Sequence, residues 1–288
     1  MSFTLFTDSS ANLTEEQFKA NNIEVVSLTL SINDKEVLCY EPGVVFDSEG
    51  FFRRMREEST LETKTSMINT AAFLTAFEPH LQAGRDILYL AMSGGISGTC
   101  EAGQKAAEIL MKKYPDRTVR VIDTLTATIG EGMIVLEAAA LRASGAGLAD
   151  VAARALQRVS EMNSYFMVDD LNFLKRGGRI SGSAALAGSI VHLKPILKGD
   201  EEGRIVLDLK ILGRKKALTT LTEIFRQRHL QREDTREIGI VHTGAEEDAH
   251  LLAADIIERY PDVTATVSVF EPCTASHVGP GAVGLFFY

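Results

Sequence analysis

Short apolar runs alternate with amphipathic segments along most of the chain. The clearest run is Ile87–Met92, which is almost continuously apolar and stops at a stretch rich in Gly, Ser and Thr. Such a run is typical of a buried strand in a parallel sheet. Apolar residues then recur at helical spacing from Glu101 to Lys113, so we expect a helix that begins near Thr99. Strand, turn and helix in this order place free N–H groups and hydroxyls where an anion or a polar ligand head is favoured.

The turn itself reads Ser-Gly-Gly-Ile-Ser-Gly-Thr over residues 93–99. It lacks the Lys of a phosphate-binding P-loop and the glycine spacing of a dinucleotide fingerprint. It comes close to a nucleophile elbow, but Ala91 stands where that motif has its first glycine. Hydroxyls without a cation favour a small anion such as one carboxylate. A βα turn whose Ser and Thr only cap the helix is the alternative.

The same alternation predicts the rest of a first lobe, residues 1–160. Expected strands are Ser2–Thr7, Ile23–Ile32 with its hairpin partner Glu36–Tyr40, and Thr118–Ile122; expected helices are Ser48–Glu58, Ala72–Leu81, Ile129–Leu141 and Leu148–Ser160. The polar stretch Thr63–Thr70 is expected to be an N-cap loop. Three strands end at Asp, Ser or Thr, and their order predicts a parallel α/β sheet with these residues on one edge.

A second lobe is expected over residues 161–288, with a mixed α/β sheet. Its strands are predicted at Tyr165–Val168, Leu193–Leu197 paired with Arg204–Leu209, Glu237–His242, Val263–Val269 and the apolar C-terminal end; its helices are predicted at Arg214–Arg228 and Glu246–Arg259. The last strand follows a Gly-Pro-Gly loop, and it could pack back near a ligand.

Composition narrows the class of protein. The chain has 288 residues, 45% hydrophobic and 24% charged, with a net charge of -9, which argues against nucleic acid as the main partner. Cys39, Cys100 and Cys273 are widely spaced without a C-x-x-C motif, which favours a reducing compartment. The N-terminus lacks the basic region of a signal peptide, and charges interrupt the longest apolar stretch, Met133–Leu156. We expect a cytoplasmic protein without a membrane span.

Two further features carry possible chemistry. His277 lies beside the glycine-rich residues 279–281, a loop that allows close approach to a ligand, whereas no pair of histidines has metal-ligand spacing, so we expect no structural metal. Between Lys175 and Lys216 the chain has ten cations and four acids. A solvated surface, an acidic protein partner or a phosphate-bearing ligand would each account for that excess.

Seven motifs in order then resemble the DegV family, the bacterial fatty-acid-binding (B) subunits of fatty acid kinase. They are TDSSANL at 7–13, SGGISGT at 93–99, VIDTLTATIGEG at 121–132, FLKRGGRIS at 173–181, KPIL at 194–197, GRKKA at 213–217 and HVGPGAVG at 277–284. The resemblance implies two α/β lobes with a long-chain fatty acid buried between them. It also implies a role in phospholipid metabolism, no cofactor, and no catalysis by this chain alone, because a separate ATP-dependent kinase subunit phosphorylates the acid.

The resemblance also implies residue roles. Ligand-binding residues carried over by motif position are Thr65, Ser66, Ser93, Ser97, Gly98, Arg179 (in preference to Arg176), His277 and Gly279; partner-binding residues are Arg214, Lys215 and Lys216. Two positions depart from the family pattern. The T-S-Q-P-S loop reads Thr-Ser-Met-Ile-Asn at 65–69, without the Pro that fixes φ, and Gly94 replaces the second Ser of the SS-x-LSGT turn.

Three functions follow from these observations. The first is a lipid-binding subunit that presents a fatty acid carboxylate to a kinase. The second is a serine hydrolase with Ser93 as nucleophile, His277 as base and Asp169 or Asp170 between them, in the chain order of the α/β-hydrolases. No oxyanion-hole motif of the H-G-G-G type accompanies it. The third, an unassisted kinase, lacks both a P-loop and an Asp-rich metal site.

Overall fold

The computed structural model describes residues 3–180, 193–232 and 235–288, so Ser181 of the FLKRGGRIS motif lies outside the described residues. The chain divides into two compact units, residues 1–46 with 63–161 and residues 47–62 with 162–288. The segment 47–62 carries helix α2 (Ser48–Glu57) into the second unit, which a single boundary near residue 160 does not provide for. Its Arg56 donates to the carbonyl oxygen of Gly244 at 2.8 Å, a contact within that unit.

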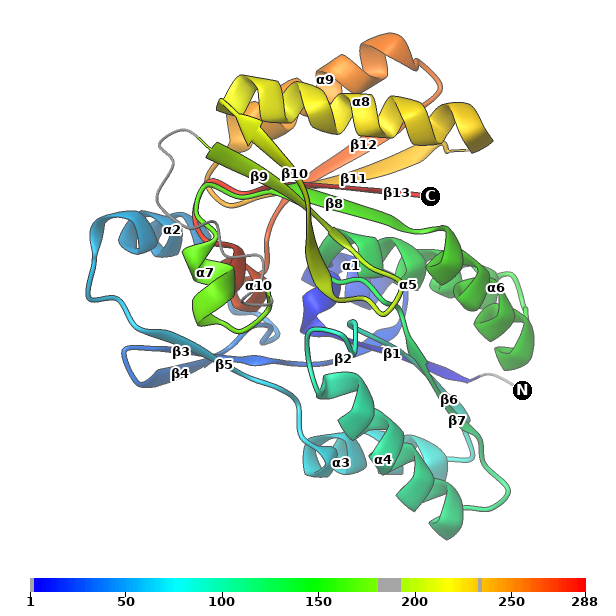
Figure 1. Cartoon of the computed structure of the whole chain (residues 1–288). Helices are drawn as coiled ribbons and strands as arrows, with labels where there is room; N and C mark the ends of the chain where they lie inside the picture. Colours follow the sequence, from blue (N-terminus) through cyan, green and yellow to red (C-terminus); the bar gives the residue numbers. More distant parts are fainter. Residues whose placement is uncertain (1–2, 181–192, 233–234) are drawn as a thin grey trace. The chain divides into compact units, whose positions relative to one another are not determined.

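The first unit contains a four-stranded parallel sheet in the order β2-β1-β6-β7. Its strands are β1 (Thr4–Asp8), β2 (Ile23–Val26), β6 (Ile87–Ala91) and β7 (Val119–Asp123). Helices packed on it are α3 (Thr70–Gln82), α4 (Thr99–Lys113), α5 (Thr128–Ala143) and α6 (Leu148–Glu161). Figure 1 shows α3 with α4 on one side of the sheet and α5 with α6 on the other. Because helices cover both faces, every residue of β6 is buried, as its apolar run predicts.

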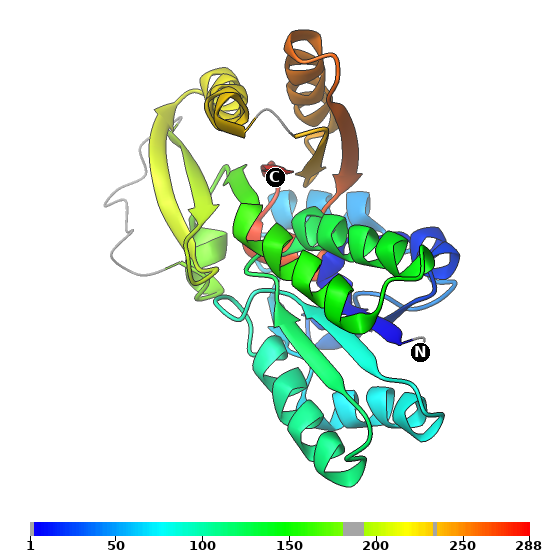
Figure 2. The same cartoon turned by 90° about the vertical axis from the view of Figure 1, so that its right-hand side faces the viewer.

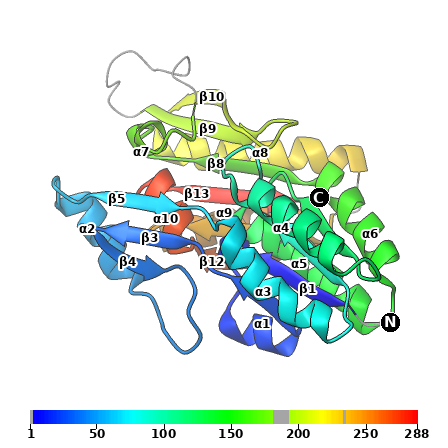
Figure 3. The same ribbon diagram turned by 90° about the horizontal axis from the view of Figure 1, so that it is seen from below.

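A second, three-stranded antiparallel sheet in this unit corrects two expectations. The expected strand Ile23–Ile32 is two strands, β2 and β3 (Thr29–Ile32), because the Leu28 N–H donates to the Ser9 hydroxyl at 3.0 Å and the chain leaves the parallel sheet there. The stretch expected to be a loop begins with strand β5 (Thr63–Ser66). Strand β3 pairs with β5 and with β4 (Lys35–Leu38), and Figure 3 shows the three side by side.

The remaining helical segments of this unit follow β1. They are the 3₁₀ turn η1 (Ser9–Ala11) and helix α1 (Glu15–Ala20). Thr14 and Gln17 form the predicted capping box of α1. The core beside β1 and β6 is aromatic: ring centroids lie 4.8 Å apart for Phe6 and Phe77 and 5.0 Å apart for Phe73 and Tyr89. These contacts pack β1 and β6 against α3, and β6 leads into the turn at 93–99.

The second unit is built on a six-stranded mixed sheet in the order β10-β9-β8-β13-β11-β12. Its strands are β8 (Asn163–Met167), β9 (Leu193–Gly199), β10 (Ile205–Leu212), β11 (Glu237–His242), β12 (Thr264–Val269) and β13 (Val283–Phe287). The predicted antiparallel pairing of β9 with β10 is confirmed. The C-terminal strand β13 is central, antiparallel to both β8 and β11, which explains why all five of its residues are buried.

Two long helices cover this sheet, α8 (Arg214–Arg232) and α9 (Glu246–Arg259). Figure 2 shows α8 beside β9 and β10 and α9 beside β12. Phe225 of α8 and Phe287 of β13 lie in the core, with ring centroids 5.1 Å apart. No helix in the described part of the chain is both long and apolar enough to cross a membrane.

Two short helices in the second unit are absent from the sequence-based prediction. They are α7 (Asn172–Arg176) and α10 (Pro272–Val278). The second has a recognisable start signal, Glu271 as N-cap followed by a proline in the first turn. It carries His277 in its last turn, so His277 belongs to a helix and not to the loop that follows.

Candidate functional site

In the first unit, two carboxylates hold the turn 93–99 from either side. Asp8, at the end of β1, accepts the Met92 N–H at 3.0 Å, and Asp123, at the end of β7, accepts the Gly94 N–H at 3.0 Å. A third bond of 2.7 Å joins the Ser93 N–H to the Thr126 carbonyl oxygen. Neighbouring parallel strands meet at one edge of the sheet, so the polar residues at their ends come together there. The predicted polar edge is therefore present, and its two acids accept hydrogen bonds from backbone N–H groups at the turn.

Burial sets the electrostatics of these two acids. Asp8 is fully buried, and burial raises its pKa while hydrogen bonds from the Met92 N–H, the Tyr89 hydroxyl and Ser10 oppose the rise. Burial likewise raises the pKa of Asp123, opposed by the N–H groups of Leu125 and Gly94. Each acid thus exchanges hydration for bonds donated by the turn and its neighbours, which ties the shape of the turn to the ends of the strands.

Ser97 and Thr99 form the hydroxyl pair of the turn. Their Oγ and Oγ1 atoms lie 2.9 Å apart, and the Thr99 N–H donates to Ser97 Oγ at 3.2 Å. Thr99 Oγ1 also accepts the Ile68 N–H at 3.3 Å, which joins the turn to the segment after β5. Ser93 differs from Ser97: it is fully buried, and its Oγ accepts the Gly95 N–H at 3.1 Å. Ser97 is the partly exposed hydroxyl of the turn.

The segment 65–69 lies against the same turn. Thr65 pairs with buried Leu30 across the β3–β5 ladder, so Thr65 and the next residue, Ser66, face opposite sides of that sheet. Thr65 is partly buried and Ser66 is exposed. Met67 reaches Gly98: a Cβ on Gly98 would lie 2.6 Å from its Sδ. The structure therefore brings Ser97, Gly98 and the segment 65–69 together, and only alternate residues of β5 share a face.

In the second unit, His277 packs against backbone and lies beside an arginine. A Cβ on Gly177 would overlap the His277 imidazole, so glycine is required for the ring to lie there. The Arg179 guanidinium donates to the Gly177 carbonyl oxygen at 2.5 Å. Burial, followed by the positive charge of Arg179, lowers the pKa of His277 from 6.5 to about 4. His277 is therefore neutral near pH 7, with a fixed positive charge beside it. Arg176, in contrast, lies over the Phe173 ring, 4.5 Å from its centroid.

The residues that follow His277 are held by Thr243. Its hydroxyl donates to the Gly279 carbonyl oxygen at 2.7 Å and accepts the Ala282 N–H at 2.8 Å. Gly279 and Gly281 both have positive φ, +78° and +87°. A Cβ on Gly279 would overlap the Phe173 ring. Gly279 thus allows the chain to bend tightly against the Phe173 ring. This structural role was not apparent from its position in the motif.

Arg214 belongs to this same network. Its guanidinium contacts Asp169 at 2.8 Å, Asp248 at 2.5 Å and the Gly281 carbonyl oxygen at 2.8 Å. These contacts hold the loop after α10. They also bind the Arg214 guanidinium to partners within its own unit. The neighbouring Lys215 and Lys216 are exposed. Of the three predicted partner-binding cations, these two are the ones presented to solvent.

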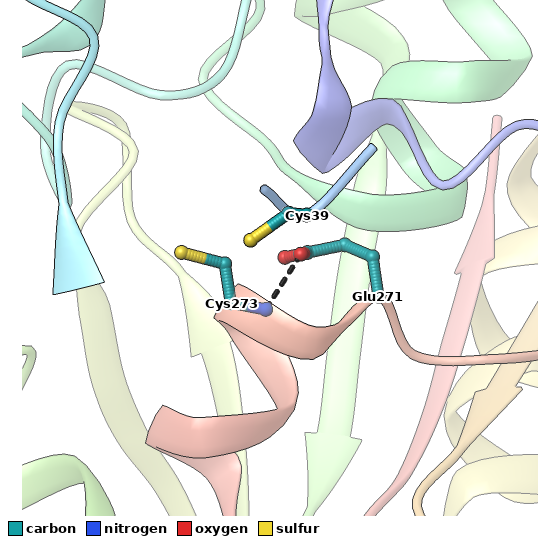
Figure 4. A group of neighbouring side chains, drawn as sticks. All are labelled: Cys39, Glu271 and Cys273. Carbon is teal, nitrogen blue, oxygen red and sulfur yellow. Dashed lines mark hydrogen bonds between the residues drawn. The ribbon is translucent and has the colours of Figure 1, made fainter. Parts of the chain in front are cut away.

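Helix α10, which carries His277, is capped by Glu271. Figure 4 shows the Glu271 carboxylate accepting the Cys273 N–H, a bond of 2.7 Å, and the Thr274 N–H also donates to it at 2.5 Å. A carboxylate and a thiol are possible metal ligands. Here, however, the carboxylate satisfies the first N–H groups of the helix, so the capping role accounts for it.

This geometry does not fit the serine hydrolase alternative. Asp169 contacts two cations, Lys194 at 2.6 Å and Arg214 at 2.8 Å, where a catalytic acid would orient a histidine. Ser93 is fully buried, whereas an elbow nucleophile is exposed at the top of its turn. The sequence predicted strand-end acids such as Asp8 and Asp123 at this edge and Thr99 as the start of a helix, but not the hydrogen bonds that they make. Thr243 had no signal in the sequence.

Comparison with known proteins agrees with this architecture. The fold and the turn define the class of protein. It is an α/β protein of two units, one with a parallel sheet and one with a mixed sheet, and it has a turn rich in hydroxyl groups. Residues 2–288 match the sequence profile described as "Uncharacterised protein, DegV family". A DegV domain-containing protein of Clostridium perfringens is 34% identical over 289 residues, which cover 99% of this chain and 97% of that protein. The chain therefore belongs to the DegV family.

Two solved structures of the family are similar over their whole length. The DegV family protein of Thermus thermophilus, described for its fatty acid binding, has 29% identity and a TM-score of 0.89, covering 100% of this chain and 99% of that one. DegV of Bacillus subtilis, described as a fatty acid binding protein, has 26% identity and a TM-score of 0.85, with the same coverage. The predicted fold class, an N-terminal parallel-sheet lobe and a C-terminal mixed-sheet lobe, is confirmed.

Proposed function

We propose that this chain binds a long-chain fatty acid and holds its carboxylate at the turn 93–99. The observation that carries the proposal is the Ser97–Thr99–Ile68 hydrogen-bond arrangement at the edge of the parallel sheet, in a chain similar over its full length to two fatty-acid-binding proteins. In the first unit the proposed head-group ligands are Thr65 and Ser97.

The energetics favour such a ligand. The methylenes of a C16–C18 chain contribute about 0.8 kcal/mol each on burial, or roughly 10 kcal/mol gross before ordering costs. A carboxylate that accompanies the chain out of water must be richly hydrogen-bonded or neutralised. The hydroxyl groups of Thr65 and Ser97 can supply such hydrogen bonds.

The test for the first unit is the double variant Thr65→Val/Ser97→Ala. Each hydroxyl bound to a charged acceptor is worth about 1.5–3 kcal/mol, so loss of both should lower palmitate affinity by roughly a hundredfold or more, while the melting temperature changes little. Thr118→Val/Ser144→Ala, which alters two exposed hydroxyls elsewhere in the unit, is the control. Unchanged affinity in the first double variant would place the head group elsewhere.

We further propose that the chain does not act on the acid itself and presents it to a separate ATP-dependent kinase subunit through Lys215 and Lys216. Both are exposed, and they lie in the first turn of α8, where cations oppose the helix dipole. Their presence there does not serve helix stability. An acidic partner is one reason for it, because charges at the rim of an interface mainly set the association rate and its salt dependence.

Lys215→Glu/Lys216→Glu should therefore slow acyl-phosphate formation with a cognate kinase and leave palmitate affinity intact. Lys105→Glu/Lys112→Glu on α4 makes the same change in net charge at two other exposed lysines and serves as the control. Turnover at low and at high salt is measured beside a direct lipid titration. Loss of lipid binding, or turnover equal to that of the control variant, would remove these lysines from the docking surface.

A further inference from the structure

The Thr99 hydroxyl is a fully buried group that connects the turn 93–99 to the segment after β5. It accepts the Ile68 N–H at 3.3 Å and lies 2.9 Å from the Ser97 hydroxyl. Ser97 Oγ in turn accepts the Thr99 N–H at 3.2 Å. Within residues 3–180, 193–232 and 235–288, the Thr99 hydroxyl has no third hydrogen-bond partner. Those three contacts are enough to decide which hydroxyl supplies the shared proton.

A single proton lies between the Ser97 and Thr99 oxygens, and it can come from either side. If Ser97 donated it, Thr99 Oγ1 would accept two bonds and its own O–H would point into the buried interior without an acceptor. Leaving a buried polar group unsatisfied is strongly disfavoured. If Thr99 donates, it makes both of its bonds, and Ser97 accepts from the N–H and the O–H of Thr99. Ser97 is partly exposed, so its proton can then point outward.

From this directionality we infer that Thr99 is a positioning residue that commits the Ser97 hydroxyl to donate toward the ligand. The chain of donors runs from the Ile68 N–H through Thr99 to Ser97 and ends on the head group. A head group that only accepts hydrogen bonds, such as an ionised carboxylate, fits this arrangement. One that must itself donate does not. This inference rests on the proposed function, since it assigns a role to a residue that supports the same site without touching the ligand.

The experiment compares delipidated wild type, Thr99→Val and Thr99→Ser by calorimetric titration with palmitate and with 1-hexadecanol. The Val variant keeps the side-chain shape but removes the donor, so palmitate affinity should fall by about tenfold. The Ser variant should restore it. Affinity for 1-hexadecanol should change much less, because its hydroxyl can donate to Ser97 when the Ser97 proton no longer points outward. Thr4→Val removes another buried hydroxyl, 3.1 Å from His80 Nδ1, and should change neither affinity.

A double-mutant cycle separates positioning from a general loss of structure. If Thr99 acts through Ser97, then adding Thr99→Val to Ser97→Ala should produce no further loss of palmitate affinity. A packing defect caused by Thr99→Val would instead lower palmitate affinity further in the double variant. Should Thr99→Val not fold, Thr99→Cys takes its place, because its thiol is a weak donor and acceptor.

Each possible result either supports or overturns the inference. Selective loss of palmitate binding in Thr99→Val, rescue by Thr99→Ser and full coupling to Ser97 would support the inference. Wild-type affinity in Thr99→Val, equal losses for palmitate and 1-hexadecanol, or additive losses with Ser97→Ala would overturn it and leave the proposed function standing. A wild type that binds neither ligand would overturn both.

Discussion

Replacing His277 with glutamine should flatten the pH dependence of the stability of the second unit. Burial and the charge of Arg179 lower the pKa of His277 from 6.5 to about 4. At pH values between these two limits the unfolded chain binds a proton that the folded chain does not, so the free energy of unfolding falls as the pH falls. At 1.36 kcal/mol per unit, the loss from pH 7 to pH 4 is about 3 kcal/mol. Above pH about 6.5 the contribution is constant.

The assay is denaturant unfolding followed by far-UV circular dichroism at pH 7, 5.5 and 4.5, since the chain has no Trp. Other groups also titrate in this range; the raised pKa of Asp8, for example, favours the folded state at low pH. They are common to both proteins, so the difference between wild type and His277→Gln isolates His277. His250→Gln, an exposed position on α9 of the same unit, is the control and should keep the wild-type slope. Parallel curves for wild type and His277→Gln would refute the reasoning.

Three further predictions concern the residues that hold the proposed site. Asp8→Asn should lower the free energy of unfolding by about 2 kcal/mol, because both carboxylate oxygens accept, one from the Tyr89 hydroxyl and the Met92 N–H and the other from the Ser10 N–H, and an amide has only one acceptor oxygen; an unchanged thermal melt would contradict this. Gly98→Ala should displace Met67 and weaken palmitate affinity severalfold in a titration, and Met67→Ala in the same protein should restore it; no restoration would mean that Met67 is not the obstacle. Thr243→Val should lower the free energy of unfolding by about 2 kcal/mol and speed hydrogen exchange at the Ala282 amide, and unchanged exchange there would count against the clamp.

Much of the fold follows from hydrophobic periodicity. The apolar run that becomes β6 and the helical spacing that becomes α4 are strong local signals, and a parallel sheet is the simplest arrangement for strands that alternate with helices. The same reasoning placed Asp8 and Asp123 at one edge, because carboxyl ends of neighbouring parallel strands share an edge. These elements needed no knowledge of long-range contacts.

Other elements depended on partners that a sequence pattern does not reveal. Thr63–Ser66 is too polar to be recognised as a strand, yet it pairs with β3, and that pairing decides that Thr65 and Ser66 face opposite ways. The break between β2 and β3 depends on the Ser9 hydroxyl, which lies far away in the chain. In each case a tertiary hydrogen bond overrides local propensity.

The position of some candidate site residues follows from the sequence, but their contacts do not. Ser97 and Gly98 lie on the turn as expected, and Arg179 lies beside His277. Arg214 was expected on a docking surface, but its guanidinium contacts Asp169 and Asp248 within its own unit. Nothing local distinguishes a cation that faces a partner from one that holds a loop. The sequence predicted Thr99 only as the start of a helix. Its proposed role depends on the direction of a hydrogen bond, which a sequence pattern does not reveal.

The central claim is that this chain binds a long-chain fatty acid, and the lipid content of the purified protein tests it most directly. Denaturing extraction into organic solvent, followed by quantitative mass spectrometry, measures the ratio of acyl species to protein. We predict a C16–C18 fatty acid at close to one molecule per chain, because burial of its methylenes contributes roughly 10 kcal/mol gross and should retain it through purification. Repeated preparations without an acyl species, and without a thermal shift on addition of palmitate, would contradict the claim.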